Sequence, residues 1–328
     1  MKAWLLDDLT GIRDLRLANA PDPVPKTGEA VLEVHYAALN PADRYLAERQ
    51  YPAKPALPHI LGRDGLGTVL EAGDATGRLR PGDRRIILRS DLGSDRPGTF
   101  AQRVAVPAES LVEVPPGWSE TEAAGAALVY LTAWQALTMW GPLADSSVVL
   151  VTGASGGVGV AAVQLASALG HRVIALSRSD EKGKRLRELG AAATYNPADP
   201  RWPKALKAVL APRRVDLAID NIGGELLPEV IDTLGNLGKV SLVGRLAGPV
   251  PNFNTAALFF RRLRLGGVAV GACSNAETLA AWRAVVGVLS RSGARPQVDS
   301  VWPFDQLPKA FARLAQGPMG KVVLQVKE

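Results

Sequence analysis

The chain has 328 residues, of which 47% are hydrophobic and 21% are charged, and its formal net charge is +6 at pH 7. This composition is ordinary for a folded chain of two domains and excludes extensive disorder. Basic residues are scattered instead of forming one run, so the charge gives no support to nucleic-acid binding. A single cysteine, Cys273, excludes an intramolecular disulfide and a multi-cysteine zinc site.

Neither a membrane span nor a signal peptide is predicted. No uninterrupted apolar run approaches the roughly 18 residues that cross a bilayer. Asp7 and Asp8 interrupt the first segment before an apolar core of signal-peptide length can form. We therefore expect a cytoplasmic protein with no membrane partner.

The first 118 residues predict a mostly antiparallel, barrel-like domain. Short strand-like runs are separated by Pro, Gly and Asp turns, and they lie at residues 30–34, 67–71, 85–88 and 101–106. Pro115, Pro116 and Gly117 mark the end of this region.

From about residue 120 to 267 the chain alternates between strands and helices. The predicted strands lie at residues 148–152, 172–176, 215–220 and 239–243. This alternation predicts an α/β domain with a doubly wound parallel sheet. The following residues leave the alternation, with a helix near 276–289 and strands near Val298 and Val322. We therefore expect domains at 1–119 and 120–267, with residues 268–328 returning to the first.

A glycine-rich turn stands inside the second domain. Residues 148–170 read VVLVTGASGGVGVAAVQLASALG: a β-branched strand, a turn, and a helix that Gly170 ends. The glycines let backbone N–H groups approach a diphosphate, and the helix N-terminus favours its negative charge. The turn therefore predicts an anionic cofactor.

Three motifs compete for this turn. As the dinucleotide fingerprint GxGxxG it begins at Ala154, so alanine replaces the first glycine. As the hydrolase elbow GxSxG it needs an acid and then a histidine, but no acidic residue separates Ser155 from His171, the one histidine that follows. Residues 152–159 match the TGxxxGxG of short-chain dehydrogenases, but no tyrosine has the lysine four residues later that this family needs. A turn without a ligand is the remaining alternative.

The residues after the second strand favour NADPH over NADH. An NAD enzyme usually places Asp or Glu there, against the ribose 2′-hydroxyl. This chain has Ser177 and Arg178, with Lys182 one turn further on. A hydroxyl and two cations suit a 2′-phosphate. The alternative is that both cations belong to a solvated helix start.

Six segments match one family in order and spacing: ALNPAD (38–43), GRDGLG (62–67), YLTAW (130–134), the turn (153–159), DNIGG (220–224) and GKVV (320–323). Together they resemble the medium-chain dehydrogenase/reductase superfamily, in its zinc-independent branch of NADPH quinone oxidoreductases (ζ-crystallin type). The resemblance covers essentially the whole chain. It implies a Rossmann cofactor domain, a GroES-like, mostly antiparallel β-barrel catalytic domain, and a homodimer formed through the edge of the cofactor-domain sheet.

Two substitutions separate this chain from the zinc-using branch. Asn40 and Arg63 stand where the resemblance places a metal-binding Cys and His. Both residue types are poor zinc ligands, so we expect no metal. The remaining chemistry is hydride transfer from NADPH to a readily reduced, electrophilic small molecule, a quinone or an α,β-unsaturated carbonyl.

Three residues of the first domain are candidates for this chemistry. Tyr51 is the expected hydrogen-bond or proton donor to the acceptor, and the alternative is an aromatic residue packing as a lid. Asn40 would contact the nicotinamide ribose or carboxamide, or else is a turn residue before Pro41. Asp43 is expected to cap the following helix and orient its neighbours.

The resemblance also implies a set of cofactor contacts. They are Asn40, Asp43, Thr132, Ser155, Gly156, Gly157, Val158, Ser177, Arg178, Lys182, Tyr195, Asn221, Val243, Gly244, Val268, Val270 and Lys321. Two other functions stay open: an enoyl-thioester reductase acting on enoyl-CoA or a carrier protein, and a catalytically silent NADPH-binding sensor, structural or RNA-binding protein.

Overall fold

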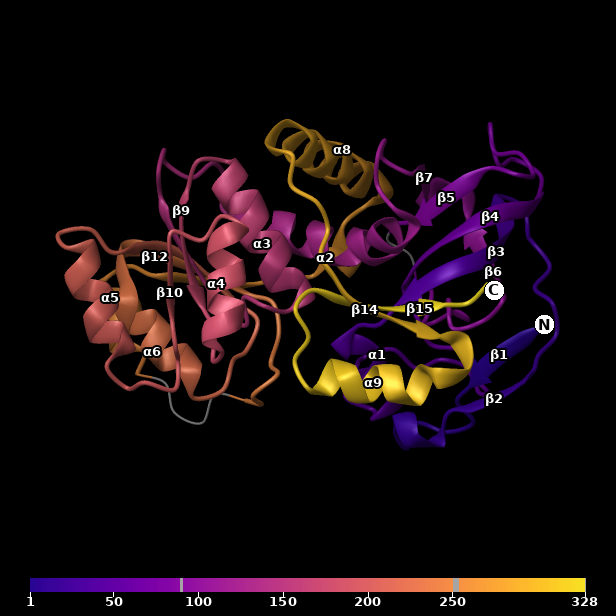
Figure 1. The fold of residues 1–328 in the computed structure, drawn as a ribbon, viewed down its shortest axis with the longest axis horizontal. Helices are drawn as coiled ribbons and strands as arrows, with labels where there is room; N and C mark the ends of the chain where they lie inside the picture. Colours follow the sequence, from indigo (N-terminus) through magenta and orange to yellow (C-terminus); the bar gives the residue numbers. More distant parts are fainter. Residues whose placement is uncertain (89–90, 250–253, 328) are drawn as a thin grey trace. The chain divides into compact units, whose positions relative to one another are not determined.

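The computed structural model describes residues 1–88, 91–249 and 254–327 (Figure 1). It divides into two compact units. Unit 1 comprises Met1–Leu128, Gly271–Leu279 and Arg295–Glu328, and unit 2 comprises Val129–Val270 and Ala280–Ala294. Within the described ranges, no helix combines the length and the apolar character needed to cross a membrane.

Unit 2 is built on a six-stranded parallel sheet. Its strands are β8 (Val148–Val151), β9 (Arg172–Leu176), β10 (Ala193–Tyr195), β11 (Val215–Asp220), β12 (Leu234–Leu242) and β13 (Arg264–Gly267). They lie in the order β10-β9-β8-β11-β12-β13, and every neighbouring pair is parallel. This is the doubly wound order, in which the strand sequence reverses beside β8. The predicted Rossmann-like sheet is therefore confirmed.

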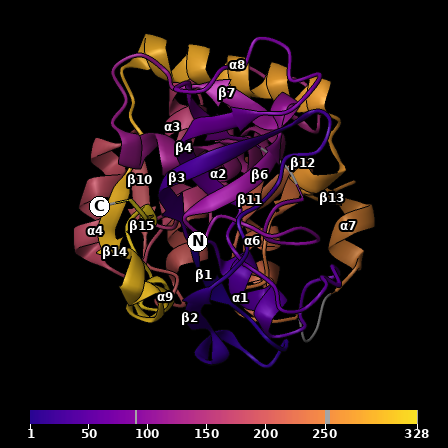
Figure 2. The ribbon, with the colours of Figure 1, turned by 90° about the vertical axis from the view of Figure 1, so that its right-hand side faces the viewer.

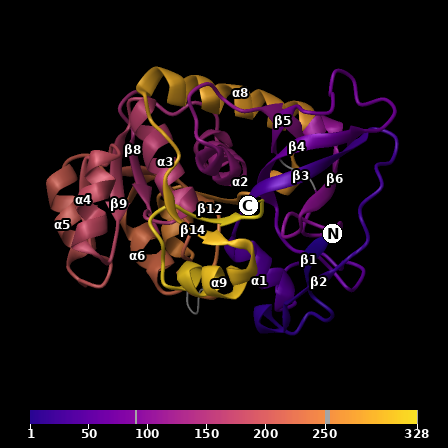
Figure 3. The same cartoon turned by 45° about the vertical axis from the view of Figure 1, so that its right-hand side comes forward.

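Helices cover this sheet. They are α3 (Gly157–Ala168), α4 (Asp180–Glu188), α5 (Trp202–Leu210), α6 (Leu226–Thr233) and α7 (Ala256–Phe260). Helix α3 packs on β8 and β9 (Figure 3), α4 on β9 and β10, and α6 on β11 and β12. All four residues of β8 are buried, as expected of a parallel strand with both faces covered. Gly170, with a φ of +82°, follows α3 and ends it in a conformation that favours glycine.

Unit 1 is a mostly antiparallel sheet with strand β3 at its centre (Figure 2). Its strands are β3 (Glu29–Ala38), β4 (Asp64–Ala72), β5 (Arg84–Ile87), β6 (Arg103–Pro107), β7 (Leu111–Glu113), β14 (Val298–Pro303) and β15 (Lys321–Gln325), beside the small pair β1 (Lys2–Leu5) and β2 (Arg16–Asn19). Strand β3 pairs with β15, β4 and β6. The helices that complete the chain are α1 (Pro41–Ala47), α2 (Glu120–Thr138), α8 (Asn275–Ser292) and α9 (Leu307–Ala315).

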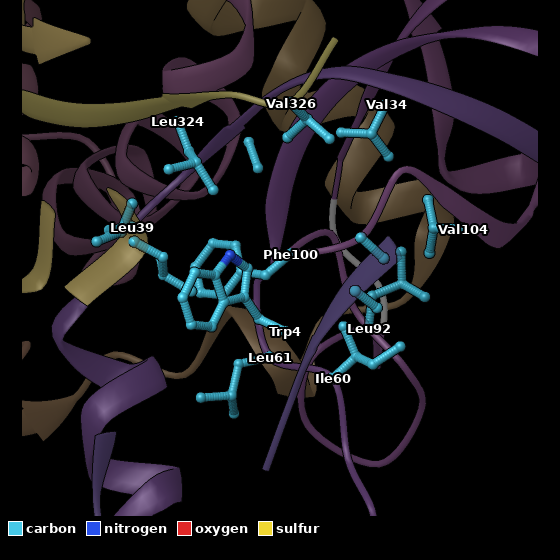
Figure 4. Close-up of a cluster of buried hydrophobic side chains, with 14 of the residues drawn as sticks. Trp4, Val34, Leu39, Ile60, Leu61, Leu92, Phe100, Val104, Leu324 and Val326 are labelled. Carbon is cyan, nitrogen blue, oxygen red and sulfur yellow. The ribbon is translucent and has the colours of Figure 1, made fainter. Parts of the chain in front are cut away.

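The core of unit 1 joins residues from both ends of the chain. Trp4, Phe100 and Leu324 lie in one buried cluster (Figure 4). The indole N–H of Trp4 donates to the backbone carbonyl of Phe304, at 2.8 Å. The rings of Phe100 and Phe311 meet edge to face, with centroids 5.9 Å apart. Burying side chains of this size stabilises the fold by roughly 2–3 kcal/mol each, so β15 and α9 are integral to unit 1.

Candidate functional site

The glycine-rich turn of unit 2 is a compact loop between β8 and α3. Gly153 has a φ of +55°. A Cβ on Gly159 would lie 2.3 Å from the carbonyl oxygen of Gly153, so only glycine fits there. A Cβ on Gly156, the N-cap of α3, would meet no atom nearer than 3.5 Å. Folding does not require glycine at Gly156, and its lack of a side chain leaves the helix N-terminus open to a diphosphate.

The ends of β8 and β11 are fixed together by a buried carboxylate. The Thr152 hydroxyl donates to Asp220 Oδ1 at 2.6 Å, and Asp220 Oδ2 accepts from the Gly223 N–H at 3.0 Å. Asn221 donates its side-chain N–H to the Thr152 carbonyl at 2.8 Å. Its Oδ1 atom is buried and has no hydrogen-bond partner among the described residues. Asn221 thus carries an unused acceptor at the edge of the sheet where α/β proteins bind ligands.

Several predicted contact residues share this carboxyl edge. Residues 155–158 follow β8, and Val243 and Gly244 follow β12. Val243 donates its N–H to the Asp220 carbonyl at 2.8 Å, and a Cβ on Gly244 would lie 2.9 Å from the Asn221 carbonyl oxygen. Val268 follows β13, and Val270 lies in the next short 3-10 helix. Thr132 lies in α2. Unit 2 therefore brings the turn and the segments after β11, β12 and β13 to one edge.

A pocket of about 140 Å³ lies between α4 and the edge strand β10. Its lining residues are Ser177, Ser179, Asp180, Gly183, Arg187, Thr194, Tyr195 and Asn196. The predicted contacts Ser177 and Tyr195 are among them, whereas Arg178 and Lys182 are not. The cation that lines the pocket is Arg187, which donates to the Thr194 hydroxyl at 2.5 Å.

Arg187 was not predicted as a contact, because the predicted cations Arg178 and Lys182 lie around the start of α4 and Arg187 lies near its end. The signal that could have identified it is helical spacing. Asp180, Gly183 and Arg187 are three and four residues apart, so they share one face of α4.

Unit 1 holds a second cluster, in which the predicted residues Asn40, Asp43 and Lys321 meet Arg63 and Asp64. Asp43 and Asp64 are fully buried, Lys321 is 5% exposed, and the side chain of Arg63 is 12% exposed. Strand β3 ends at Ala38, which pairs with Asp64 on one side and with Val323 on the other. The ends of β3, β4 and β15 thereby place two carboxyl groups beside two cations.

In one half of the cluster, formed by Asn40, Asp64 and Lys321, every side-chain N–H group already donates a hydrogen bond. Lys321 Nζ donates to the Leu39 carbonyl (3.0 Å), Asn40 Oδ1 (2.7 Å) and Asp64 Oδ2 (2.9 Å), which uses all its N–H groups. Asn40 donates to Asp64 Oδ2 at 2.9 Å and to the Ala38 carbonyl at 3.4 Å. In this arrangement the side chains of Asn40 and Lys321, both predicted cofactor contacts, bind partners within unit 1.

The other half keeps unused hydrogen-bonding capacity. Asp43 Oδ2 accepts the Asn40 N–H at 2.8 Å, which is the cap predicted for α1. Asp43 Oδ1 lies 3.5 Å from Arg63 Nε, an ion pair too long for a hydrogen bond. The Arg63 guanidinium carbon lies 4.2 Å from the centroid of the Tyr51 ring. Arg63 Nε and Nη2 are buried and have no hydrogen-bond acceptor in the parts of the chain that the structure describes.

Burial raises the pKa of Asp43 from 3.8 to about 6, against the lowering effects of Arg63, the Asn40 N–H and Lys321, and Asp64 raises it further. Between these pH values folded Asp43 holds a proton that the unfolded chain releases. Its contribution to the free energy of unfolding should therefore fall by about 3 kcal/mol as the pH rises from 4 to 6 and above.

Urea unfolding of the wild type and of Asp43→Asn at pH 4 to 7 checks this expectation. The other carboxyl groups are the same in both proteins, so they do not contribute to the difference in free energy of unfolding. As the pH rises, the wild type should lose stability relative to Asp43→Asn. A difference that is independent of pH would contradict it.

Two protein-family models match the chain. Residues 26–116 match the alcohol dehydrogenase GroES-like domain, and residues 157–287 match the zinc-binding dehydrogenase family. Within the described residues, no three His, Cys, Asp or Glu side chains gather as metal ligands. In the cluster of unit 1, the Arg63 guanidinium group lies beside Asp43 and the Lys321 ammonium group lies beside Asp64. This donor set does not fit a zinc ion.

Three known proteins are similar over nearly the whole chain. The human quinone oxidoreductase is 25% identical over 92% of this chain and 90% of its own. The crystal structure of an NAD-dependent alcohol dehydrogenase is 30% identical, with a TM-score of 0.92 and full coverage of both chains. The mycobacterial Rv1454c, complexed with NADPH, is 26% identical, with a TM-score of 0.89, and the match covers 99% of this chain and 100% of that one.

Proposed function

We propose that this chain, which belongs to the medium-chain dehydrogenase/reductase family of oxidoreductases, transfers hydride from NADPH to a quinone or an α,β-unsaturated carbonyl compound without zinc. The observation that carries the proposal is the bonding of Lys321. Its ammonium group is held by Asn40, Asp64 and a backbone carbonyl, so the polar cluster of unit 1 contains an internal cation.

Without a metal ion to polarise a carbonyl group, the acceptor must be one that is easily reduced. Addition of hydride to an enone or a quinone produces an anion whose charge is delocalised onto oxygen, and a side-chain donor can stabilise it. The human relative is named as a quinone oxidoreductase, which supports this class of acceptor. NADPH, when bound, supplies the hydride.

The residues of unit 2 would hold the cofactor. Residues 155–158 and the N-terminus of α3 would bind the diphosphate, and Asn221 offers its unpartnered Oδ1 atom as an acceptor. Ser177 and Tyr195 would contact the adenosine end, with cations supplied by Arg187 in the pocket and by Arg178 and Lys182 outside it. The related structure with NADPH supports this choice of cofactor. We also propose a cytoplasmic homodimer formed through the edge of the unit 2 sheet.

In unit 1, Tyr51 would supply the proton. Its phenol O–H would donate a hydrogen bond to the acceptor oxygen and stabilise the negative charge that hydride addition creates there. One hydride and one proton then reduce the acceptor by two electrons. Asp43 would keep α1 and Arg63 in place beside Tyr51.

The proposal is tested by following NADPH oxidation with purified, metal-free protein. The acceptors are a panel of quinones, 2-alkenals, enones and crotonyl-CoA, and each is run with NADPH and with NADH. We expect turnover with quinones or enones, faster with NADPH, and unchanged by added zinc or chelator. If crotonyl-CoA is the one acceptor that is reduced, the protein is a thioester reductase. If no acceptor accelerates NADPH oxidation, the protein is not a reductase of these compounds and the proposal fails.

A further inference from the structure

The cluster of unit 1 separates into a saturated half and an open half. Asn40, Asp64 and Lys321 bind one another, and the ammonium group keeps no free N–H. Asp43 and Arg63 are different, since Asp43 Oδ1 and two guanidinium nitrogens have no hydrogen-bond partner among the described residues. The feature that lies against this open half is the ring of Tyr51.

Tyr51 is held from two sides. Its ring packs against the hydrophobic core of unit 1, and the Arg63 guanidinium lies over it, 4.2 Å from the centroid. A guanidinium group over an aromatic ring is attracted by the ring quadrupole, more strongly where water is excluded. With its side chain 12% exposed, Arg63 is well placed for this interaction.

Arg63 is itself fixed by a buried carboxyl group. Asp43 lies on the first turn of α1, where it accepts the Asn40 N–H, and its other oxygen faces Arg63 Nε. A buried guanidinium group is costly unless a partner is near, so this ion pair limits the positions open to Arg63. Asp43, Arg63 and Tyr51 thus form a stack in the sense of a row of neighbours, in which Asp43 pairs with Arg63 and Arg63 lies over the Tyr51 ring.

We propose that Arg63 is a positioning residue for Tyr51: anchored by Asp43, its guanidinium group holds the phenol ring so that the hydroxyl oxygen keeps one position. This inference rests on the proposed function, in which Tyr51 donates the proton. Its consequence is that Arg63, at the position where the family resemblance implies a metal-binding His, acts here through a neighbouring side chain.

The test compares Arg63→Met and Arg63→Lys with the wild type and with Tyr51→Phe. Arg63→Lys keeps the charge but lacks the planar group that stacks, so it carries the test even where Arg63→Met does not fold. Unit 1 also offers a matched control. Arg44 lies over the Tyr45 ring at the longer distance of 5.5 Å and is 39% exposed, so Arg44→Met removes a similar pair away from the stack.

We expect both Arg63 variants to lower kcat by roughly ten- to a hundredfold, because a donor misplaced by about 1 Å loses that much rate. The KM for NADPH should not change, and Arg44→Met should behave as the wild type. An unchanged kcat, or a loss confined to the KM of the acceptor, would overturn the proposal.

A second readout does not depend on turnover. The chain has five tyrosines, so 3-fluorotyrosine labelling gives five ¹⁹F resonances, and Tyr51→Phe identifies the one from Tyr51. The Arg63 variants should shift or broaden this resonance, and Arg44→Met should leave it in place. If it does not move, Arg63 does not hold Tyr51. If it moves but no acceptor is reduced by the wild type, the positioning role stands and the proposed function fails.

Discussion

Replacing Lys321 with methionine is expected to lower the free energy of unfolding by about 3–5 kcal/mol, because it leaves the buried carboxylate of Asp64 without its cation. Asp64 is fully buried, and Lys321 lies 2.9 Å from it. The same change leaves Asn40 Oδ1 and the Leu39 carbonyl without their donor. Urea unfolding measures the loss, and a loss below about 1 kcal/mol, the range of a surface pair, would contradict this expectation.

Two further variants test whether the loss comes from the unpaired charge of Asp64. The double variant Asp64→Asn, Lys321→Met removes both charges, so it should recover much of the stability that Lys321→Met loses. The matched control is Lys327→Met. Lys327 is 49% exposed and pairs with Glu33 on the surface, so its loss should cost less than about 1 kcal/mol.

A methyl group on Gly159 is expected to disrupt the turn of unit 2. A Cβ there would lie 2.3 Å from the Gly153 carbonyl oxygen and 2.6 Å from the Ala154 Cα, and backbone atoms cannot move aside without opening the loop. Gly159→Ala should therefore destabilise the protein by about 3 kcal/mol and abolish NADPH binding. Unfolding by urea and titration calorimetry with NADPH report the two effects.

The companion variant Gly156→Ala separates folding from binding. Its Cβ would meet no atom nearer than 3.5 Å, so the loss of stability should stay below about 1 kcal/mol, the cost of alanine at an N-cap. The new methyl group would stand where a diphosphate approaches the helix N-terminus, so the affinity for NADPH should fall at least about tenfold, or 1.4 kcal/mol. Gly287→Ala on α8 is the control for both variants. Wild-type affinity in Gly156→Ala would show that the turn does not hold the cofactor.

The parallel sheet was predictable because its signals are local. The strand β8 is an unbroken apolar run, and the turn after it, which spans only a few residues, requires Gly153 and Gly159. The alternation of strands and helices then favours a parallel sheet with right-handed crossovers. The fold class could therefore be inferred from sequence.

The clusters of side chains were not predictable in the same way. Lys321 binds residues 281 and 257 positions away in the sequence, and only the pairing of β15 with β3 brings them together. The sequence identified Asn40 and Lys321 as candidates, but it revealed neither the hydrogen bond between them nor the contact of Arg63 with the Tyr51 ring. Which N–H groups remain free depends on distances of a few tenths of an ångström, which no motif encodes.

The pairing of β15 with β3 has a consequence for the order in which the chain folds during synthesis. Most of unit 2 is one continuous stretch, residues 129–270, and can fold as the ribosome releases it. Unit 1 is synthesised first, but its fold is completed last, because Leu324 and Val326 belong to its core and Lys321 neutralises Asp64. Until they emerge, the end of β3 at residues 36–38 lacks the partner that β15 supplies, and Asp64 has no cation. Nascent unit 1 is therefore the part of this chain that stays incomplete longest, with apolar surface exposed until its last strand is made.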